Sequence, residues 1–445
     1  MKISELTARV NARLGIDTLN PMQRSTSAIR RGTRSLLLAP TGSGKTLAFT
    51  LPFLASLPPA ADDGPVGVVI APTRELVLQI FETVRTLASP DYKTAALYGG
   101  HDMRTEVASL QGAPGIIVAT PGRLLDHLHR GHVSLYAVKS LVLDEYDKAL
   151  ELGFHDEMRA IAGRMRNLST LFLTSATAAA EIPDFIGSAP IDRYDFLDDS
   201  SAVPEIECFR VASADTDKLE TLDQLLRRLQ GRGKTIVFLN HRDAAERVYK
   251  YLHGRRFPAG LYHGGLEQQD RERALILFDN GTTPVLVSTD LASRGLDIEG
   301  VENVIHYHLA PTGQSNTHRN GRTARMGASG NAFYIISSAD KVPDFVPECP
   351  LYQPQGEAPQ EVHKSPTATL FFNAGKKEKI SRGDIAGFLM QKGGLERQEV
   401  GRIDVRDHCA FVAVPAGKAR ATVEALAPHR IKNTRVRVTQ LKGLK

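Results

Sequence analysis

The sequence contains few cysteines and no long apolar segment. Its three cysteines, Cys208, Cys349 and Cys409, are too far apart along the chain to form a disulfide framework or a zinc-binding spacing. No apolar run approaches the ~18 residues that a membrane-spanning helix needs, and the first residues lack the apolar core of a signal peptide. The 14 histidines show no metal-site clustering. We therefore expect a cytoplasmic protein with no membrane segment and no disulfide partner.

Charge is distributed unevenly along the chain. Residues 361–445 carry 17 Lys and Arg against 8 Asp and Glu, a net charge of +9. Because the whole chain has a formal charge of +5, residues 1–360 have a net charge of −4. A basic segment of this kind favours a polyanionic partner for the C-terminal end, above all nucleic acid. A solvated, lysine-rich surface is the alternative.

A glycine-containing loop at residues 39–46, Ala-Pro-Thr-Gly-Ser-Gly-Lys-Thr, lies between a strand-like run and a helix-like run. Its backbone N–H groups are expected to face a polyphosphate at the helix N-terminus. Lys45 is the expected cation for the β- and γ-phosphates, and the Thr46 hydroxyl is the expected Mg²⁺ ligand. The nucleotide-binding residues predicted here are Thr41, Gly42, Ser43, Gly44, Lys45 and Thr46.

A second motif, Asp-Glu-Tyr-Asp at residues 144–147, ends another apolar strand about a hundred residues later. Asp144 is the expected metal ligand, and Glu145 is the expected group that orients the attacking water. The pair of motifs in this order predicts an ATPase. A glycine turn followed by a solvated acidic loop is the alternative.

Two α/β blocks precede a smaller C-terminal one. Fully apolar runs alternate with helical patterns in both blocks, which predicts two tandem parallel sheets joined near residues 198–204. The expected strands are residues 35–38, 66–70, 116–119, 141–143 and 170–173 in the first block and 235–239, 285–288 and 304–307 in the second.

A Pro-rich stretch at residues 342–366 indicates a linker. Beyond it the pattern predicts a strand at 369–373, a helix at 383–391, strands at 399–404 and 409–414, a helix at 418–427 and a strand at 434–440. This β-α-β-β-α-β order is the ferredoxin-like arrangement of RNA-recognition modules. Arg435 and Arg437 alternate with valines, so both are expected on one sheet face, as phosphate contacts.

The ordered motifs of residues 1–340 resemble those of the DEAD-box RNA helicases of superfamily 2. The resemblance is carried by residues 15–23, residues 39–46, Pro72-Thr73-Arg74-Glu75-Leu76, Gly99-Gly100, Thr120-Pro121-Gly122-Arg123, residues 144–147, Ser175-Ala176-Thr177, Ile236-Val237-Phe238-Leu239-Asn240, His263-Gly264 with Gln268 and Arg271, Ser288-Thr289-Asp290, Arg294-Gly295-Leu296-Asp297 and residues 318–325. It implies two RecA-like domains, ATP and Mg²⁺ as cofactors, and an RNA-stimulated ATPase that locally separates short RNA duplexes.

The resemblance also implies a role for each matching residue. Gln23 would read adenine, and Asp297 would contact the ribose. The implied RNA contacts are Pro72, Thr73, Arg74, Gly99, Gly100, Thr120, Pro121, Gly122 and Arg123 in the first domain and Gly264, Arg271 and Thr289 in the second. The implied residues for coupling between the ATP and RNA sites are Asp147, Ser175, Thr177, His318 and Arg319. Arg322 and Arg325, three apart on one helical face, are the expected catalytic arginine fingers.

The sequence departs from the family pattern inside the acidic motif. Tyr146 stands where the family has alanine, and Ile16 stands where an aromatic residue often stacks on adenine. Tyr146 leaves a second function open, an ATP-gated RNA-binding clamp without productive unwinding. A DNA-directed motor is a third possibility, against which the RNA-recognition-like tail argues.

The C-terminal module resembles the RNA-binding domain of the DbpA subgroup of these helicases. The matching residues are Gly383-Asp384-Ile385, Gly393-Gly394-Leu395 and residues 400–404 and 411–414. In that subgroup the module binds a ribosomal RNA hairpin, which implies remodelling of ribosomal RNA during large-subunit assembly by a monomeric enzyme. The expected domains are an ATP-binding domain at 1–200, a helicase C-terminal domain at 205–345, a linker at 346–364 and an RRM-like RNA-binding domain at 365–445.

Overall fold

The computed structural model describes residues 1–40, 42–59, 64–177, 182–197, 206–214, 216–290, 300–324, 329–354 and 356–443. The described chain divides into two compact units, the first of which ends before residue 205. The predicted join at residues 198–204 lies outside the described residues.

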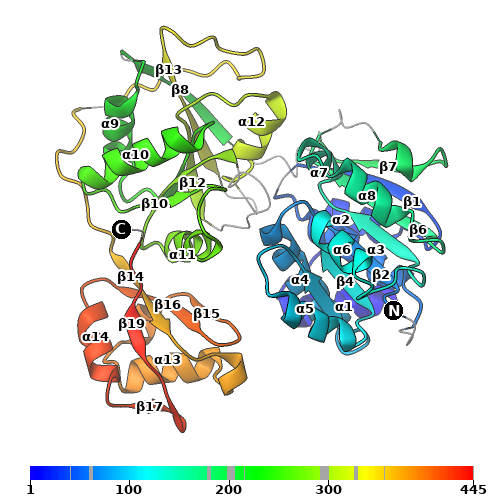
Figure 1. The fold of residues 1–445 in the computed structure, drawn as a ribbon. Helices are drawn as coiled ribbons and strands as arrows, with labels where there is room; N and C mark the ends of the chain where they lie inside the picture. Colours follow the sequence, from blue (N-terminus) through cyan, green and yellow to red (C-terminus); the bar gives the residue numbers. More distant parts are fainter. Residues whose placement is uncertain are drawn as a thin grey trace. The chain divides into compact units, whose positions relative to one another are not determined.

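The first unit is built on a parallel sheet of seven strands in the order β3-β4-β2-β5-β6-β1-β7 (Figure 1). The strands are β1 (Arg34–Leu38), β2 (Gly67–Ile70), β3 (Thr94–Leu97), β4 (Ile116–Ala119), β5 (Ser140–Leu143), β6 (Thr170–Ser175) and β7 (Asp192–Asp195). The helices are α1 (Ile3–Leu14), α2 (Pro21–Ser27), α3 (Lys45–Ser56), α4 (Arg74–Ala88), α5 (Met103–Gln111), α6 (Pro121–His129), α7 (Tyr146–Glu151), α8 (His155–Ala162) and the short η1 (Asp184–Ile186).

The side chains of these strands pack alternately in two hydrophobic cores. Val142 and Phe172 pack in one core with residues of α1, α3 and α4. Leu141 and Leu171, one residue away on the same strands, pack in the other core with residues of α6 and α8. Because successive side chains of a strand point to opposite faces, the sheet is covered on both sides. This explains why its central strands are apolar throughout.

The second unit contains a parallel sheet of six strands in the order β10-β11-β9-β12-β13-β8. Its strands are β8 (Ile206–Ser213), β9 (Lys234–Phe238), β10 (Ala259–Tyr262), β11 (Val285–Ser288), β12 (Val301–His306) and β13 (Gly330–Ser337). Its helices are α9 (Leu219–Leu229), α10 (Arg242–Gly254), α11 (Gln268–Asp279) and α12 (Gly313–Asn320).

The same unit ends in a small antiparallel sheet of four strands in the order β15-β16-β14-β19. Its elements are β14 (Thr367–Phe372), η3 (Lys376–Glu378), α13 (Arg382–Gln391), η4 (Arg397–Glu399), β15 (Ile403–Val405), β16 (Ala410–Pro415), α14 (Ala419–Leu426), β17 (Arg430–Ile431), β18 (Thr434–Arg435) and β19 (Val438–Gln440). The chain order of the four strands and two helices is the ferredoxin-like one. The predicted fold class, two RecA-like parallel sheets followed by a small RRM-like module, is confirmed.

The predicted last strand at residues 434–440 is wrong as one element. Residues of β18 pair with β17 in a separate hairpin, and only β19 joins the four-stranded sheet. The break lies at Arg437, whose backbone N–H donates to the side chain of Asn373 at 2.7 Å instead of to a neighbouring strand. Arg435 and Arg437 are both exposed, as the alternation with valines predicts, but they do not share one sheet.

The Pro-rich stretch packs against the second unit along part of its length. Arg210 of β8 forms an isolated parallel bridge with Leu351, and its backbone N–H donates to Pro350 at 2.9 Å. The ring of Tyr352 contacts those of Phe209 and Phe333 edge-on. Residues near 350 therefore lie against the edge strand β8 instead of forming a free linker.

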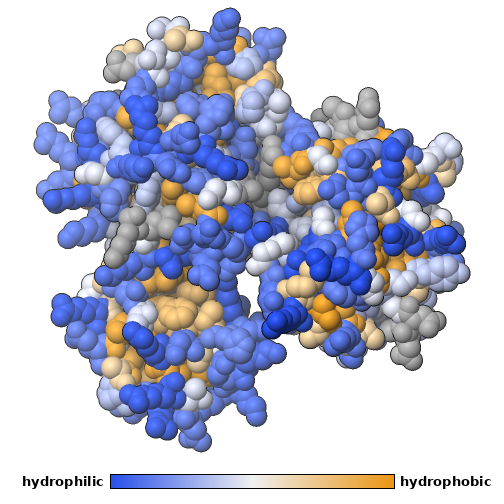
Figure 2. All heavy atoms as spheres, viewed as in Figure 1, coloured by the Kyte–Doolittle hydropathy of each residue, from blue (hydrophilic) through white to orange (hydrophobic). Residues whose placement is uncertain are grey.

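Hydrophilic residues predominate on the visible face, and hydrophobic residues form separate patches on it (Figure 2). The described helices include none that is long and apolar enough to cross a membrane.

We expect Gly67→Ala to destabilise the first unit by about 1–3 kcal/mol, because added atoms in a close-packed core force neighbours out of place. A Cβ at position 67 would lie 2.7 Å from Phe53 Cζ and 2.8 Å from Leu57 Cδ2. Gly254→Ala is the control, since a Cβ there meets no described atom within 4 Å. Thermal unfolding should separate the two variants, and an unchanged transition in Gly67→Ala would contradict the packing described here.

Candidate nucleotide and RNA sites

The phosphate loop leads from β1 into α3. Gly44 has a φ of +89° at the N-cap of α3, a conformation that favours glycine. A Cβ at Gly44 would also lie 2.6 Å from Nε2 of Gln23. Gln23 donates to the Gly44 carbonyl at 3.3 Å, and Asn20 donates to the Ser43 carbonyl at 2.9 Å. The predicted adenine-reading segment is thus attached directly to the phosphate loop.

Lys45 lies in the first turn of α3, and its side chain is buried. Its ammonium group donates to the carbonyls of Ala39 at 2.6 Å and Pro40 at 3.3 Å. The cation is therefore held inside the curve of the loop, where the N-terminus of α3 also attracts negative charge. This is the electrostatic arrangement that a polyphosphate requires.

The acidic motif follows β5, next to β6. Thr174 donates to Oδ1 of Asp144 at 2.5 Å and accepts from the backbone N–H of Glu145 at 3.0 Å. Burial and the neighbouring Glu145 hold the pKa of Asp144 well above its usual range. Oε2 of Glu145 is buried and has no hydrogen-bond partner among the described residues. Buried carboxylate oxygens of this kind fit a hydrated divalent cation, which prefers oxygen ligands.

The side chain of Tyr146 lies in the hydrophobic core. It is fully buried and packs in the cluster that contains Leu143 and Leu173. Burial raises the pKa of Tyr146 to about 12. The bulky side chain is therefore accommodated beneath the motif, and Asp144 and Glu145 remain at the end of β5.

The Ser-Ala-Thr motif follows β6 and contacts the acidic motif. The Ser175 hydroxyl accepts from the backbone N–H of Thr177 at 3.0 Å. The Thr177 hydroxyl donates to Oδ2 of Asp147 at 3.5 Å. The structure thus brings together the three first-unit residues that the family resemblance assigns to coupling.

The loops predicted to bind RNA follow β2, β3 and β4, which are neighbours in the sheet. The side chain of Arg74 crosses the Gly99-Gly100 turn, so that a Cβ at Gly100 would lie 2.3 Å from its Nη1. Gly100 has a φ of +80°, which also favours glycine. Thr73 caps α4 by accepting from the Leu76 N–H at 3.3 Å. Pro72 is buried beside it.

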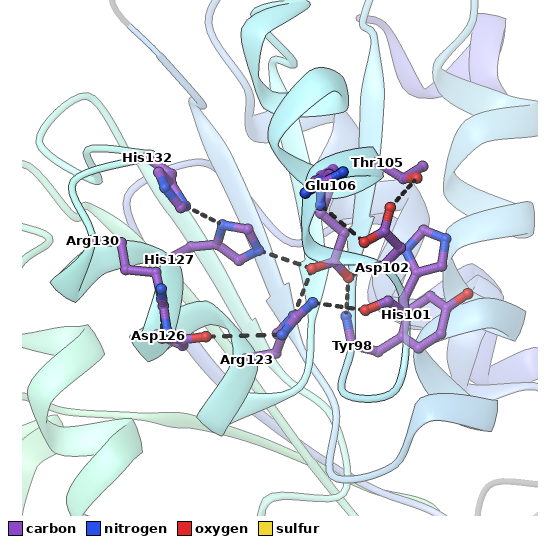
Figure 3. A network of polar contacts seen from close by, with 11 residues as sticks. Tyr98, His101, Asp102, Thr105, Glu106, Arg123, Asp126, His127, Arg130 and His132 are labelled. Atoms are coloured by element: carbon purple, nitrogen blue, oxygen red, sulfur yellow. Dashed lines mark hydrogen bonds and ion pairs between the residues drawn. The ribbon is translucent and has the colours of Figure 1, made fainter.

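Thr120, Pro121 and Gly122 form the N-terminus of α6. No side chain of the described chain caps this helix, so its first N–H groups are available to an anion. Arg123 is turned inward: its Nε donates to Glu106 at 2.6 Å and its Nη2 to the His101 carbonyl at 2.9 Å (Figure 3).

The predicted RNA contacts of the second unit also gather at one sheet edge. Gly264 follows β10 and Thr289 follows β11, and these strands pair in parallel with Tyr262 opposite Ser288. Arg271 lies in the first turns of α11, and its Nε is buried without a hydrogen-bond partner among the described residues. The three residues come from adjacent elements, as an extended phosphate-binding surface requires.

Arg319 is fully buried in the second unit. It donates to Oδ1 of Asp290 at 2.5 Å, to Oδ1 of Asn240 at 2.7 Å and to the His308 carbonyl at 2.8 Å. His318 and Arg322 are also buried, and Nε of Arg322 donates to the His318 carbonyl at 3.4 Å. Arg319 therefore joins the ends of β9, β11 and β12 within its own unit.

The C-terminal module contacts α11 of the preceding parallel-sheet domain. Arg402 pairs with Asp279 at 2.5 Å, and Arg406 pairs with Glu272 at 3.2 Å. Thr369 is buried, and its hydroxyl is within hydrogen-bond distance of the Asn280 and Thr282 side chains.

These contacts involve the outer face of the module's sheet. Phe372 lies in the core on the inner face, whereas the Phe371 and Phe411 rings meet on the outer face with centroids 5.5 Å apart. The Arg406 guanidinium covers the Phe411 ring at 5.2 Å.

Three family models match the chain: the DEAD/DEAH box helicase model over residues 20–185, the helicase conserved C-terminal domain over 217–327 and the DbpA RNA binding domain over 369–440. The chain is 36% identical over 439 residues to the ATP-dependent RNA helicase DbpA of Escherichia coli, with 96% of both chains covered. It belongs to the DEAD-box ATP-dependent RNA helicases.

Further relatives match the helicase core. The DEAD-box helicase CshA of Bacillus subtilis is 34% identical, with 76% of this chain and 69% of that protein covered. Among solved structures, Dbp5 of S. cerevisiae bound to RNA and ADP BeF3 superposes with a TM-score of 0.67 at 26% identity, covering 76% of this chain and 88% of that one. The helicase is accordingly an RNA-stimulated ATPase with RecA-like domains.

Three predicted site residues of the helicase, Thr41, Asp297 and Arg325, lie outside the described residues. Conversely, two residues that sequence reasoning missed are prominent in the structure: the buried Glu106, and Thr174, which contacts both members of the acidic pair. A sequence signal existed for Thr174, since it directly precedes the Ser-Ala-Thr motif.

We expect Arg319→Met to destabilise the second unit of the helicase by about 3 kcal/mol, because removing one member of a buried ion pair leaves the other uncompensated. The matched control is Arg247→Met, since Arg247 pairs with Asp217 on the exposed surface and exposed pairs contribute about 0–1 kcal/mol. Denaturant unfolding measures both. Equal stability of the two variants would show that the Asp290 and Asn240 contacts contribute little.

Proposed function

We propose that the helicase remodels structured ribosomal RNA during large-subunit assembly and that its C-terminal module selects the RNA. The observation that carries this proposal is the module itself: an RRM-like fold with a net charge of +9 over residues 361–445, attached to a core of net charge −4. The family model of this region is an RNA-binding domain. Counterion release makes such a charge excess the main source of RNA affinity.

The module would bind RNA through a surface other than the outer face of its sheet. That face contacts α11 through Thr369 and the Arg406 pair, and the ring of Phe411 is covered by Arg406. The exposed Arg435 and Arg437, near the β17–β18 hairpin, are the proposed phosphate contacts. Base stacking on Phe371 and Phe411 is not part of the proposal.

In the ATP site, each motif residue has a proposed task. Lys45 would exchange its bonds to the Ala39 and Pro40 carbonyls for bonds to phosphate oxygens. Thr46 and Asp144 would hold Mg²⁺, which when bound neutralises phosphate charge. Glu145, with its unpartnered Oε2, would orient the attacking water and accept its proton. Arg322 and Arg325 retain their proposed role in stabilising the transferring phosphoryl group.

Each unit is proposed to contact RNA through its own loops, which follow β2, β3 and β4 in the first unit and β10 and β11 in the second. Backbone N–H groups and arginines dominate these loops, and they suit phosphates better than base edges. The core would therefore bind RNA without regard to sequence, which leaves selection to the module. Dbp5 of S. cerevisiae, whose structure is similar to the helicase core, was solved bound to RNA and ADP BeF3.

The clamp without productive unwinding is not favoured. Tyr146 was the only reason to consider this function. Its side chain is buried in the core, and the two carboxylates still follow β5. The geometry of the acidic motif is therefore compatible with ATP turnover.

We expect Glu145→Gln to lower RNA-stimulated ATP turnover by at least ~10²-fold, because an amide cannot accept the proton of the attacking water. ATP and RNA binding should persist, whereas Lys45→Ala should weaken ATP binding as well. Asp156→Asn, which alters an exposed carboxylate on α8, is the control. Wild-type turnover in Glu145→Gln would remove Glu145 from the mechanism.

We expect a chain lacking residues 365–445 to keep ATPase activity with generic RNA at high concentration and to lose preference for a structured ribosomal RNA fragment over a scrambled one. The paired variant Arg435→Gln with Arg437→Gln should reduce the salt dependence of RNA binding by up to about 0.9 per lost phosphate contact, in log–log slope. Titrations against both RNAs at several salt concentrations provide the measurement. Equal preference with and without the module would refute selection by the module.

A further inference from the structure

A buried carboxylate outside the ATP site connects the two first-unit loops that carry candidate RNA contacts. Glu106 lies in the first turn of α5, and its side chain is 1% exposed. Because helical side chains lean toward the N-terminus of their helix, the carboxylate reaches back toward the turn formed by residues 98–101, which joins β3 to α5. Figure 3 shows it at the centre of a network of polar side chains.

The partners of Glu106 come from both loops. The backbone N–H of Tyr98 donates to Oε1 at 3.0 Å, and Nδ1 of His101 lies 3.4 Å from the same oxygen. Oε2 accepts from Nε of Arg123 at 2.6 Å and is 2.9 Å from Nε2 of His127. Arg123 and His127 are four residues apart and therefore face the same side of α6. A carboxylate offers about four lone-pair sites, and Tyr98, Arg123 and His127 occupy three of them in this one.

The side chain of Arg123 contacts other residues of the protein in this arrangement. Besides the bond to Glu106, its Nη2 donates to the His101 carbonyl at 2.9 Å, and its Nη1 lies 3.8 Å from Asp126. The side chain is only 15% exposed. The guanidinium therefore connects α6 to the turn after β3, and the backbone N–H groups of both loops become the candidate phosphate donors.

Backbone N–H donors have a fixed direction, whereas side-chain donors do not. A side chain can rotate toward a phosphate, whereas the N–H groups of the Gly99-Gly100 turn and of the first turn of α6 point where the chain holds them. The distance between the two sets of donors then depends on what joins the loops. Among the described residues, Glu106 and Arg123 join them directly.

We infer that Glu106 is a positioning residue for RNA binding: its carboxylate fixes Arg123 and the 98–101 turn so that the N–H groups of both loops are held at the spacing that RNA phosphates require. The inference rests on the proposed RNA-binding role of these loops and assigns Arg123 to their positioning. A glutamine at this position would turn an N–H₂ group toward donors, so it cannot replace the carboxylate.

The test measures ATP turnover of the full-length protein against the concentration of a generic single-stranded RNA at saturating ATP. In Glu106→Gln, the RNA concentration for half-maximal stimulation should rise about tenfold or more, with a smaller fall in the maximal rate. Glu106→Asp keeps the charge and should recover part of the loss. Arg123→Gln should raise the RNA concentration for half-maximal stimulation to a similar extent. The double variant should need no more RNA than the more impaired of the two single variants, because both substitutions remove the same connection.

Two further variants separate the possible failures. Glu82→Gln removes an exposed carboxylate that pairs with Arg85 on α4, and it should leave the RNA requirement unchanged. Gly100→Ala strains the turn directly. An unchanged RNA requirement in Glu106→Gln while Gly100→Ala raises it would overturn the inference and keep the loop assignment. An unchanged requirement in both would overturn the loop assignment as well. Where thermal unfolding shows that Glu106→Gln has lost its fold, Glu106→Asp and Arg123→Gln decide the question in the same way.

Discussion

Parallel pairing of the strands requires every strand of the first sheet to end at the same edge. The order β3-β4-β2-β5-β6-β1 divides that edge into two halves. The phosphate loop, the acidic motif and the Ser-Ala-Thr motif follow β1, β5 and β6, and the three candidate RNA loops follow β2, β4 and β3. Ligands of open α/β sheets bind at the carboxyl ends of the strands. One sheet can therefore carry the candidate ATP-site motifs on one half of its edge and the candidate RNA loops on the other, and the two halves meet between β2 and β5.

Buried charged residues connect the loops at these edges. Glu106 joins the turn after β3 to α6, and Arg319 joins the ends of three strands in the second unit. Such groups are costly to bury unless every polar atom is satisfied. Their benefit is directional, because a hydrogen-bonded charge holds its partners in one geometry where apolar packing would allow several. Both units place this kind of contact beside candidate site residues.

Much of the fold was predictable from local sequence, and the remainder depends on long-range pairing. Apolar runs revealed β2, β4, β5 and β6 because these strands are buried on both faces. β7, with the sequence Asp-Arg-Tyr-Asp, was missed because it lies at the edge of the sheet and is largely exposed. The candidate ATP-site motifs could be recognised in the sequence because their residues are contiguous. Glu106 could not be found in that way, since its contact with Arg123 exists only because β3 and β4 are neighbours in the sheet.

The burial of Tyr146 has a consequence for exchanging sequence between relatives. The family's alanine at this position is much smaller than the phenol ring that fills the space under the acidic motif here. Replacing Tyr146 with alanine would leave a void directly beneath Asp144 and Glu145, unless the surrounding leucines changed with it. Tyr146 and its neighbours thus pack as one group, so exchanging the motif alone between homologues would transfer its carboxylates without the side chains that support them.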